Sequence, residues 1–154
     1  MQNESSSTLR VRYQETDQMG VVHHGNYITW FEVARTDWLR ELGTDYRQIE
    51  EMGLLLPVIQ VHCKYKQSAR YDDVLRIRAR MVEYSGVKLT FAYDVYREDE
   101  LLATGTTAHC WTNKNMRPTP LKKIWPELDQ RIRERLGQLS TKTASQSESS
   151  ASSF

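Results

Sequence analysis

One loop of this sequence joins residue types that could hydrolyse a carbonyl compound. Asp17 ends the segment Glu15-Thr16-Asp17, and the loop from Gly20 to Asn26 then leads into a segment with helical periodicity. A helix start offers unpaired backbone N–H groups and the positive end of the helix dipole, which stabilise a developing oxyanion. A carboxylate just upstream could attack a carbonyl there or activate water. Spacing alone favours the plainer interpretation, in which Asp17 is a turn residue and His24 a polar residue near the helix cap.

Other kinds of reactive site find little support. The sequence contains no G-x-S-x-G motif, no phosphate-binding glycine loop and no Rossmann fingerprint. Two adjacent histidines on a regular element cannot both face one ion, and no carboxylate or cysteine stands beside them at zinc-ligand spacing. We therefore expect no metal and no cofactor, and we exclude serine hydrolases, kinases and dehydrogenases. The four histidines are His23, His24, His62 and His109.

The composition narrows the class of protein. The chain has 154 residues, 21 basic and 20 acidic, with a net charge of +1. Such a charge favours neither nucleic acid nor a membrane surface, so an anionic ligand needs a local cluster of cations. The first ten residues lack an apolar signal segment, and Cys63 and Cys110 are typical of buried, reduced thiols. We expect a cytoplasmic protein with no nucleic-acid or membrane partner.

The segment after the loop predicts one long helix. Asn26 is a plausible N-cap, and Gly43 follows the last apolar position as a C′ glycine does. A helix with so many aromatic residues on one face needs a broad, flat partner, which indicates a sheet. The apolar positions, spaced by three and four, are Tyr27, Trp30, Phe31, Ala34, Trp38 and Leu42.

Alternating residues predict that sheet. Turns at Ser85-Gly86 and at 98–100 join the last three strands into an antiparallel meander. A short helix is expected from Pro126 to Leu136, capped by Gly137. The fold class is therefore α+β, with one long helix against a mostly antiparallel sheet. The expected strands are 9–16, 58–66, 73–84, 87–95 and 101–113.

The domain organisation follows from these elements. We expect a flexible N-terminus at 1–8, one globular domain at 9–138 and a disordered serine-rich tail at 139–154. One helix covers only one sheet face, and the sheet edges need protection, so we expect edge-to-edge pairing into a homodimer or tetramer. The uncovered face would carry Arg76, Arg78 and Arg80.

The stretch from Arg12 to Gly43 resembles the signature of the 4-hydroxybenzoyl-CoA thioesterase family, in particular its YbgC-like acyl-CoA thioesterase branch. Residues 71–75, Tyr-Asp-Asp-Val-Leu, are similar to the family's third-strand entry, and the resemblance spans roughly 10–125. The shared positions in the first block are Tyr13, Thr16-Asp17, Gly20-Val21-Val22, His24, Tyr27, Phe31-Glu32 and Ala34-Arg35.

The resemblance implies a hotdog fold, in which a five-stranded sheet wraps one long helix and dimers share active sites. It implies that Asp17 is the catalytic carboxylate, as nucleophile or as general base. It also implies that a backbone N–H at His24 or Gly25 holds the thioester oxygen, and that the His24 side chain positions water or substrate. Glu15 stands where the family often has aspartate, which puts only fine positioning in doubt.

The resemblance implies an acyl-CoA substrate, cleaved to free acid and CoA. Lys88 is the nearest match for a cation that binds the CoA phosphates, with Arg76 and Lys64 as alternatives by charge. Two other functions stay open: a thioesterase for an aryl-CoA such as 1,4-dihydroxy-2-naphthoyl-CoA, and a non-catalytic acyl-CoA-binding protein. A hotdog hydratase fits less well, because its Asp and His have four residues between them whereas Asp17 and His24 have six, 18–23.

Overall fold

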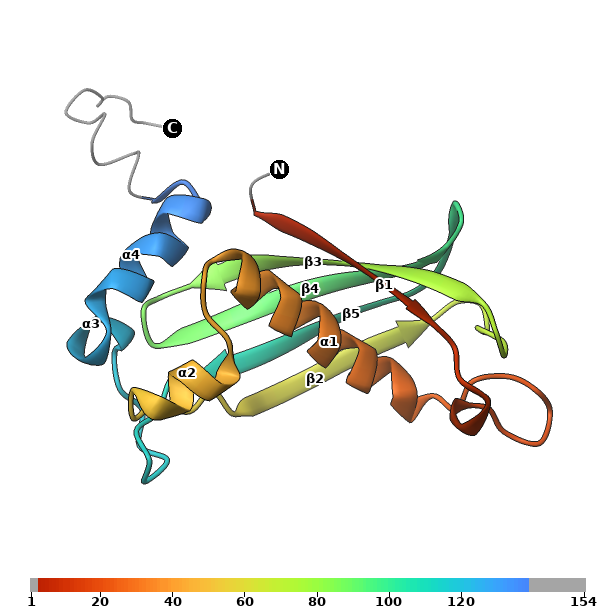
Figure 1. Ribbon diagram of the computed structural model, residues 1–154, viewed down its shortest axis with the longest axis horizontal. Coiled ribbons are helices and arrows are strands. Elements are labelled where there is room, and N and C mark those ends of the chain that lie inside the picture. The colour runs from red at the N-terminus through yellow and green to blue at the C-terminus, as the bar shows by residue number, and fades with distance from the viewer. Residues whose placement is uncertain (1–2, 139–154) are drawn as a thin grey trace.

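The computed structural model describes residues 3–138, and Figure 1 shows one long helix lying across a five-stranded sheet. The strands are β1 (Glu4–Arg10), β2 (Val58–Tyr65), β3 (Val74–Tyr84), β4 (Lys88–Arg97) and β5 (Glu100–Cys110). The order across the sheet is β1-β3-β4-β5-β2, and each neighbouring pair is antiparallel. The helices are α1 (Gly25–Glu41), α2 (Tyr46–Glu51), α3 (Leu121–Ile124) and α4 (Pro126–Arg135). This confirms the predicted α+β class.

The core lies between α1 and the sheet. Phe31 of α1 stacks on Tyr93 of β4, with ring centroids 4.4 Å apart. Gly105 of β5 allows this approach, because a Cβ there would lie 2.5 Å from the Phe31 ring. Trp38, about two helical turns beyond Phe31, meets Phe91 edge-on at 5.2 Å. The aromatic face predicted from the sequence is therefore the face that packs on the sheet.

The first strand differs from the prediction. The expected strand at 9–16 has the wrong bounds, because β1 covers Glu4–Arg10 and residues 13–15 form a short 3-10 helix. Residues 4–8, predicted as part of a flexible N-terminus, therefore belong to a strand. Two of its serines are buried and bind carboxylates of α1: Ser5 Oγ donates to Glu41 at 2.8 Å, and Ser7 Oγ donates to Asp37 at 2.6 Å. Hydrogen bonds, in place of apolar side chains, thus fix this strand to the helix.

The predicted C-terminal end of α1 is correct, whereas its predicted N-cap is not. Gly43 follows the C-cap residue Leu42 with φ +96°, as predicted, because this backbone conformation favours glycine. Asn26 is not the N-cap, since α1 begins at Gly25 and Asn26 lies inside its first turn. The helix α4 from Pro126 was predicted, whereas α2 and α3 were not.

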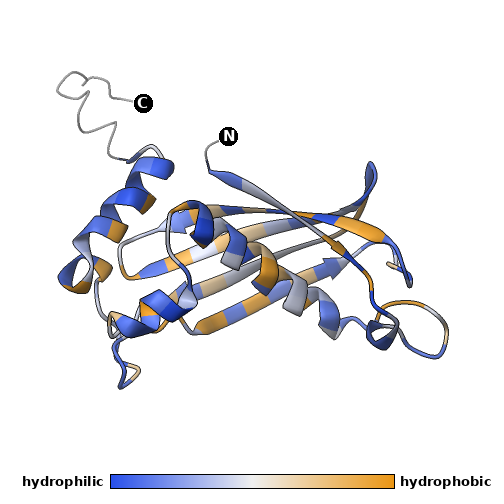
Figure 2. Cartoon of the chain, viewed as in Figure 1, coloured by the Kyte–Doolittle hydropathy of each residue, from blue (hydrophilic) through white to orange (hydrophobic). Residues whose placement is uncertain are grey.

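One edge of the sheet is open. Figure 2 shows hydrophobic residues along the first half of β2, which is an edge strand. The exposed apolar side chains of β2 are Val58, Ile59, Val61 and Tyr65. None of the helices between residues 3 and 138 is long and apolar enough to cross a membrane. The predicted tail at 139–154 lies outside the described residues.

Candidate active site

A buried carboxylate fixes the segment that leads from β1 to α1. Glu15 is 6% exposed and accepts hydrogen bonds from the Arg12 backbone N–H at 2.8 Å and from Trp30 Nε1 at 3.1 Å. Its backbone oxygen accepts from the N–H of His23 and from Asn26 Nδ2, both at 2.9 Å. One residue thus joins the segment before Asp17 to the start of α1. The sequence indicated only that Glu15 stands where the family often has aspartate, and its structural role was missed.

Asp17 lies in a tight, exposed turn. Its Oδ1 accepts from the Met19 N–H at 2.8 Å and from the Val21 N–H at 3.3 Å. Its own N–H donates to the Val21 oxygen at 2.8 Å. Oδ2 makes no hydrogen bond to any residue from 3 to 138. The turn therefore orients the carboxylate through one oxygen and leaves the other for a ligand or water.

The start of α1 presents one unpaired N–H group. The Gly25 N–H donates to His23 Nδ1 at 3.1 Å, so a side chain already occupies one of the two N–H groups proposed for the oxyanion. The His24 N–H makes no hydrogen bond within the described part of the chain. The rings of His23 and His24 stack with centroids 4.4 Å apart. Of the two predicted positions, His24 is the one whose N–H is available.

A cavity of about 340 Å³ opens beside this helix start, between α1 and the end of β2. Tyr65 Oη donates to the His24 carbonyl at 3.1 Å, and Tyr27 Oη accepts from the Ala69 N–H at 3.1 Å. Burial raises the pKa of Tyr27, which keeps its hydroxyl protonated. His24, Tyr27 and Tyr65 line the cavity, whereas Asp17 is not among its lining residues and makes no hydrogen bond to His24. The two tyrosines were not predicted as site residues.

The three predicted phosphate ligands lie at two ends of the sheet. Lys64 precedes Tyr65 at the end of β2, so it lies at the end where α1 begins. Lys88 begins β4 beside the end of β3, and β3 spans about 30 Å at a usual strand rise. Within one chain, Lys88 therefore lies far from the Asp17 turn, which follows β1 near the start of β3.

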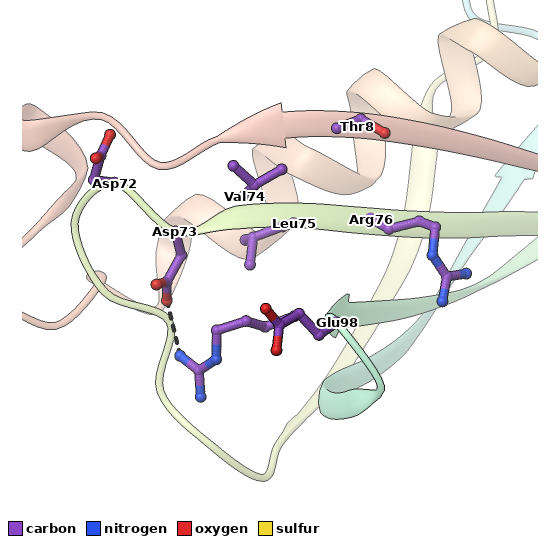
Figure 3. A pocket seen from close by; sticks show the side chains of 8 residues that line it. Thr8, Asp72, Asp73, Val74, Leu75, Arg76 and Glu98 are labelled. Atoms are coloured by element: carbon purple, nitrogen blue, oxygen red, sulfur yellow. Dashed lines mark hydrogen bonds and ion pairs between the residues drawn. The ribbon is translucent and has the colours of Figure 1, made fainter.

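Arg76 lies nearer to the Asp17 turn and lines a hollow of about 510 Å³ (Figure 3). Its guanidinium lies 4.7 Å from the Tyr96 ring centroid, and no carboxylate between residues 3 and 138 forms an ion pair with it. In the same hollow, Arg97 pairs with Asp73 at 2.8 Å, the dashed contact in Figure 3. Arg76 is therefore a cation of this hollow that makes no ion pair with the described residues, although Asp72, Asp73 and Glu98 also line the hollow.

Metal ligation has no visible basis in the part of the chain that the structure describes. No group of three or more His, Cys, Asp or Glu side chains is close enough there to hold an ion. Cys63 and Cys110 are both free thiols, the first partly buried and the second buried. The site is built from one carboxylate, one helix start and neutral aromatic side chains.

Comparison with known proteins identifies the family. Residues 11–136 match the thioesterase-like superfamily. The chain belongs to this superfamily. It is 34% identical to the putative acyl-CoA thioesterase YneP of Bacillus subtilis, over 80% of this chain and 91% of that protein. It is 32% identical to the acyl-CoA thioesterase YbgC of Haemophilus influenzae, over 80% and 92%.

The fold comparison agrees with this assignment. The structure of a DHNA-CoA thioesterase from Staphylococcus aureus aligns with a TM-score of 0.81 and 30% identity, over 97% of each chain. The hotdog fold and the resemblance to YbgC-like thioesterases, both expected from the sequence, are confirmed. This thioesterase is accordingly a thioester hydrolase by family.

Proposed function

We propose that this thioesterase hydrolyses the thioester of a fatty or small acyl-CoA to free acid and CoA, with Asp17 as the catalytic carboxylate. One observation carries the proposal. The exposed Asp17 turn is fixed, through Glu15, to a helix start whose His24 N–H is unpaired. Two relatives, the acyl-CoA thioesterase YbgC and the putative acyl-CoA thioesterase YneP, support the choice of substrate class.

The reaction needs a stabilised oxyanion and an activated nucleophile. The thioester oxygen would accept from the His24 N–H, where the dipole of the 17-residue helix α1 adds positive potential. Asp17 would attack the carbonyl carbon through its free oxygen, so that the C–S bond breaks, CoA leaves as the thiolate and water then hydrolyses the acyl-aspartyl anhydride. Alternatively, it would take a proton from a water that attacks the carbonyl carbon, after which the C–S bond breaks and CoA leaves as the thiolate. The His24 side chain, which lines the cavity, would position that water or the substrate.

The active unit we propose is a homodimer or a larger oligomer. The apolar side chains exposed on the edge strand β2 support this, because an unpaired apolar edge favours strand pairing. Lys88 could then reach the CoA phosphates from a second copy, since it is remote from Asp17 in its own chain. Lys64 and Arg76 would act within the chain that supplies Asp17. The compartment we propose is the cytoplasm, where the free thiols Cys63 and Cys110 would stay reduced.

An aryl-CoA is the second candidate substrate. It is favoured by the 30% identity with the DHNA-CoA thioesterase over 97% of both chains. A protein that only binds acyl-CoA is the less favoured alternative, since it would not need the Asp17 carboxylate. The two hydrolase candidates share one fold and the same proposed catalytic residue, so the acyl pocket must distinguish them.

Turnover of a panel of aliphatic and aromatic acyl-CoAs by the purified protein tests the proposal. We expect release of free CoA, detected with a thiol reagent, from at least one class. The class with the highest kcat/KM assigns the substrate. Binding of acyl-CoA without any turnover would support the acyl-CoA-binding alternative and contradict the hydrolase.

A further inference from the structure

A second cavity, open to solvent, lies at the other end of β2 and is lined by residues of α1, of α2 and of the segment that leads into β2. Its volume is about 500 Å³. Apolar side chains form much of its wall, and the carboxylates of Glu32 and Glu50, which are exposed to solvent, also line it. Arg35 and Tyr46 are the other polar residues of the wall, and Arg35 is buried. The apolar part of the wall includes Leu55, Leu56, Pro57 and Val58.

Arg35 is a buried cation without a carboxylate partner. It is 6% exposed, and its hydrogen bonds run to two phenols: Nε donates to Tyr46 Oη at 2.9 Å, and Nη1 donates to Tyr93 Oη at 3.2 Å. Within residues 3–138 no carboxylate lies within 4.0 Å of it. Burying an unpaired charge is costly, so such a cation indicates a site that a ligand completes.

The buried side chains that follow Arg35 in its hydrogen-bonded chain carry no negative charge either. Tyr93 Oη bonds Thr107 Oγ1 at 2.6 Å, and Thr107 Oγ1 in turn bonds His109 Nε2 at 2.8 Å. His109 is fully buried, and burial together with the charge of Arg35 lowers its pKa to about 4. The whole chain of groups is therefore neutral apart from the guanidinium.

Two hydrogen-bond donors remain for the cavity. Arg35 Nη2 makes no hydrogen bond to the described residues. It is also not one of their fully buried side-chain atoms that lack a hydrogen-bond partner, so this nitrogen is accessible to solvent. Tyr46 Oη accepts from Arg35, and its own proton has no acceptor in the described part of the chain. Burial raises the pKa of Tyr46, so that proton is retained. The two groups are adjacent and each has one N–H or O–H donor left for the cavity, which suits an oxygen acceptor on the ligand.

This cavity is remote from the catalytic turn of its own chain but not from that of a second copy. Arg35 lies 11 positions beyond His24, about 16 Å along α1. Antiparallel pairing of β2 with a second β2 about a two-fold axis reverses the strand. The Val58 end of one chain then lies beside the Tyr65 end of the other, with both α1 helices on the same side of the joined sheet. The Arg35 cavity would face the His24 cavity of the neighbour.

We propose that Arg35 and Tyr46 select acyl groups that carry an oxygen acceptor at their distal end, and that they do so for the Asp17 site of the opposite chain. This inference rests on the proposed function, because it assigns the acyl specificity of that same reaction. The acceptor is a hydroxyl, keto or carboxylate oxygen. The apolar wall takes the rest of the acyl group, and the two donors bind its end.

The first test compares matched substrates of short and medium chain length: alkyl, terminally hydroxylated and terminally carboxylated acyl-CoAs. We expect the wild type to prefer an oxygenated form by about tenfold or more in kcat/KM, because a site built to bond an oxygen discriminates against its absence. A preference for the hydroxylated substrate indicates a neutral acceptor, and a preference for the carboxylated substrate indicates an anionic one. Arg35→Met and Tyr46→Phe should bring the ratio toward one, whereas the exposed Arg40→Met on the same helix should leave it unchanged.

Tyr46→Phe keeps the test valid if Arg35→Met does not fold, which circular dichroism would show. No preference in the wild type, or a preference that survives both variants, would overturn the inference while leaving the hydrolase intact. Absence of turnover for every acyl-CoA would instead contradict the proposed function, and this inference with it.

A mixed dimer tests whether Arg35 serves the Asp17 site of the opposite chain or that of its own chain. Copies carrying Asp17→Asn and copies carrying Arg35→Met are tagged differently, coexpressed and purified through both tags. If Arg35 serves the opposite chain, one of the two sites in the mixed dimer is fully intact, and the oxygenated preference returns. If both residues serve one chain, no intact site exists, and the preference stays lost. That second result would overturn the assignment.

Discussion

The indole nitrogen of Trp30 donates to the carboxylate of Glu15 at 3.1 Å, inside the protein. Trp30 lies on the buried face of α1, and Glu15 lies two residues before Asp17. The bond therefore holds the segment that leads into the Asp17 turn against α1. The Asp17 turn is exposed, and the buried bond between Glu15 and Trp30, which lies outside the turn, supports it.

The first prediction concerns Asp17→Asn. We expect the fold to persist, because the side chain is exposed and its bonds stay within one turn. Loss of the carboxylate should lower kcat by roughly 10² to 10⁴, the range for a positioned acid–base group. The control is Asp99→Asn, in the exposed turn between β4 and β5. A near-normal kcat in the first variant would remove Asp17 from the mechanism.

The second prediction concerns the edge strand. Sedimentation should show at least a dimer for the wild type, and Val61→Asp should yield monomers with much lower turnover. A charge on an edge strand opposes pairing, and Val61 is 41% exposed, so the monomer itself should tolerate the change. Val82→Asp on β3, where the side chain is 47% exposed, is the matched control. A wild type that is fully active as a monomer would contradict the dimeric site.

The third prediction concerns Lys88→Ala. KM for acyl-CoA should rise several-fold with little change in kcat, because the phosphates bind equally in the ground and transition states. An exposed contact of this kind is worth about 1 kcal/mol and is screened over about 8–10 Å at physiological salt. Added salt should therefore mimic the variant in the wild type. Lys123→Ala on α3 is the control. If KM does not change, Arg76 or Lys64 becomes the candidate.

The fourth prediction concerns stability against acid. The folded-state pKa of His109 is lowered to about 4, first by burial and then by Arg35, while Phe91 and Thr107 are its neutral neighbours. Because only the unfolded chain takes up this proton below about pH 6.5, the free energy of unfolding should fall from there toward pH 4. The loss should be on the order of 3 kcal/mol. Denaturant titrations of His109→Gln should show a shallower fall, and an equal one would contradict the assignment.

The fifth prediction concerns the contact between helix and sheet. A Cβ at residue 105 would lie 2.5 Å from the Phe31 ring and 2.8 Å from the His62 oxygen. Since overpacking of a core costs about 1–3 kcal/mol, Gly105→Ala should lower the free energy of unfolding by that amount. The exposed neighbour Thr106→Ala should change it little. Equal stability of the two variants in urea titrations would contradict the packing argument.

Elements with a strong apolar period were predictable from the sequence. The helix α1 and the β3–β4 hairpin follow from spacings of three to four and of two, respectively. The strand β1 was not predictable in this way, since its buried Ser5 and Ser7 have no apolar signature and depend on partners about thirty positions away. Pairing partners of polar side chains cannot be inferred from a local pattern.

The candidate site was likewise predictable from the sequence only in part. The Asp17 turn and the helix start could be located by residue type and spacing. The occupation of the Gly25 N–H by His23 could not, because it depends on a side-chain direction. Arg35 stood in the sequence only as a helix residue of a family signature. Only the structure shows that Arg35 bonds to Tyr93, 58 positions away, and that it has no carboxylate partner among the described residues.

The pairing of β1 also bears on the order in which the enzyme forms. Within the sheet β1 bonds only to β3, and its partners Leu9 and Leu75 are 66 positions apart. Closing so long a loop is slow, whereas the β3–β4 and β4–β5 hairpins close over a few residues. We expect the hairpins to form first and β1 to join them late. The Asp17 turn follows β1 after the short 3-10 helix at 13–15, so we expect a nascent chain to form its hairpin core before its candidate site.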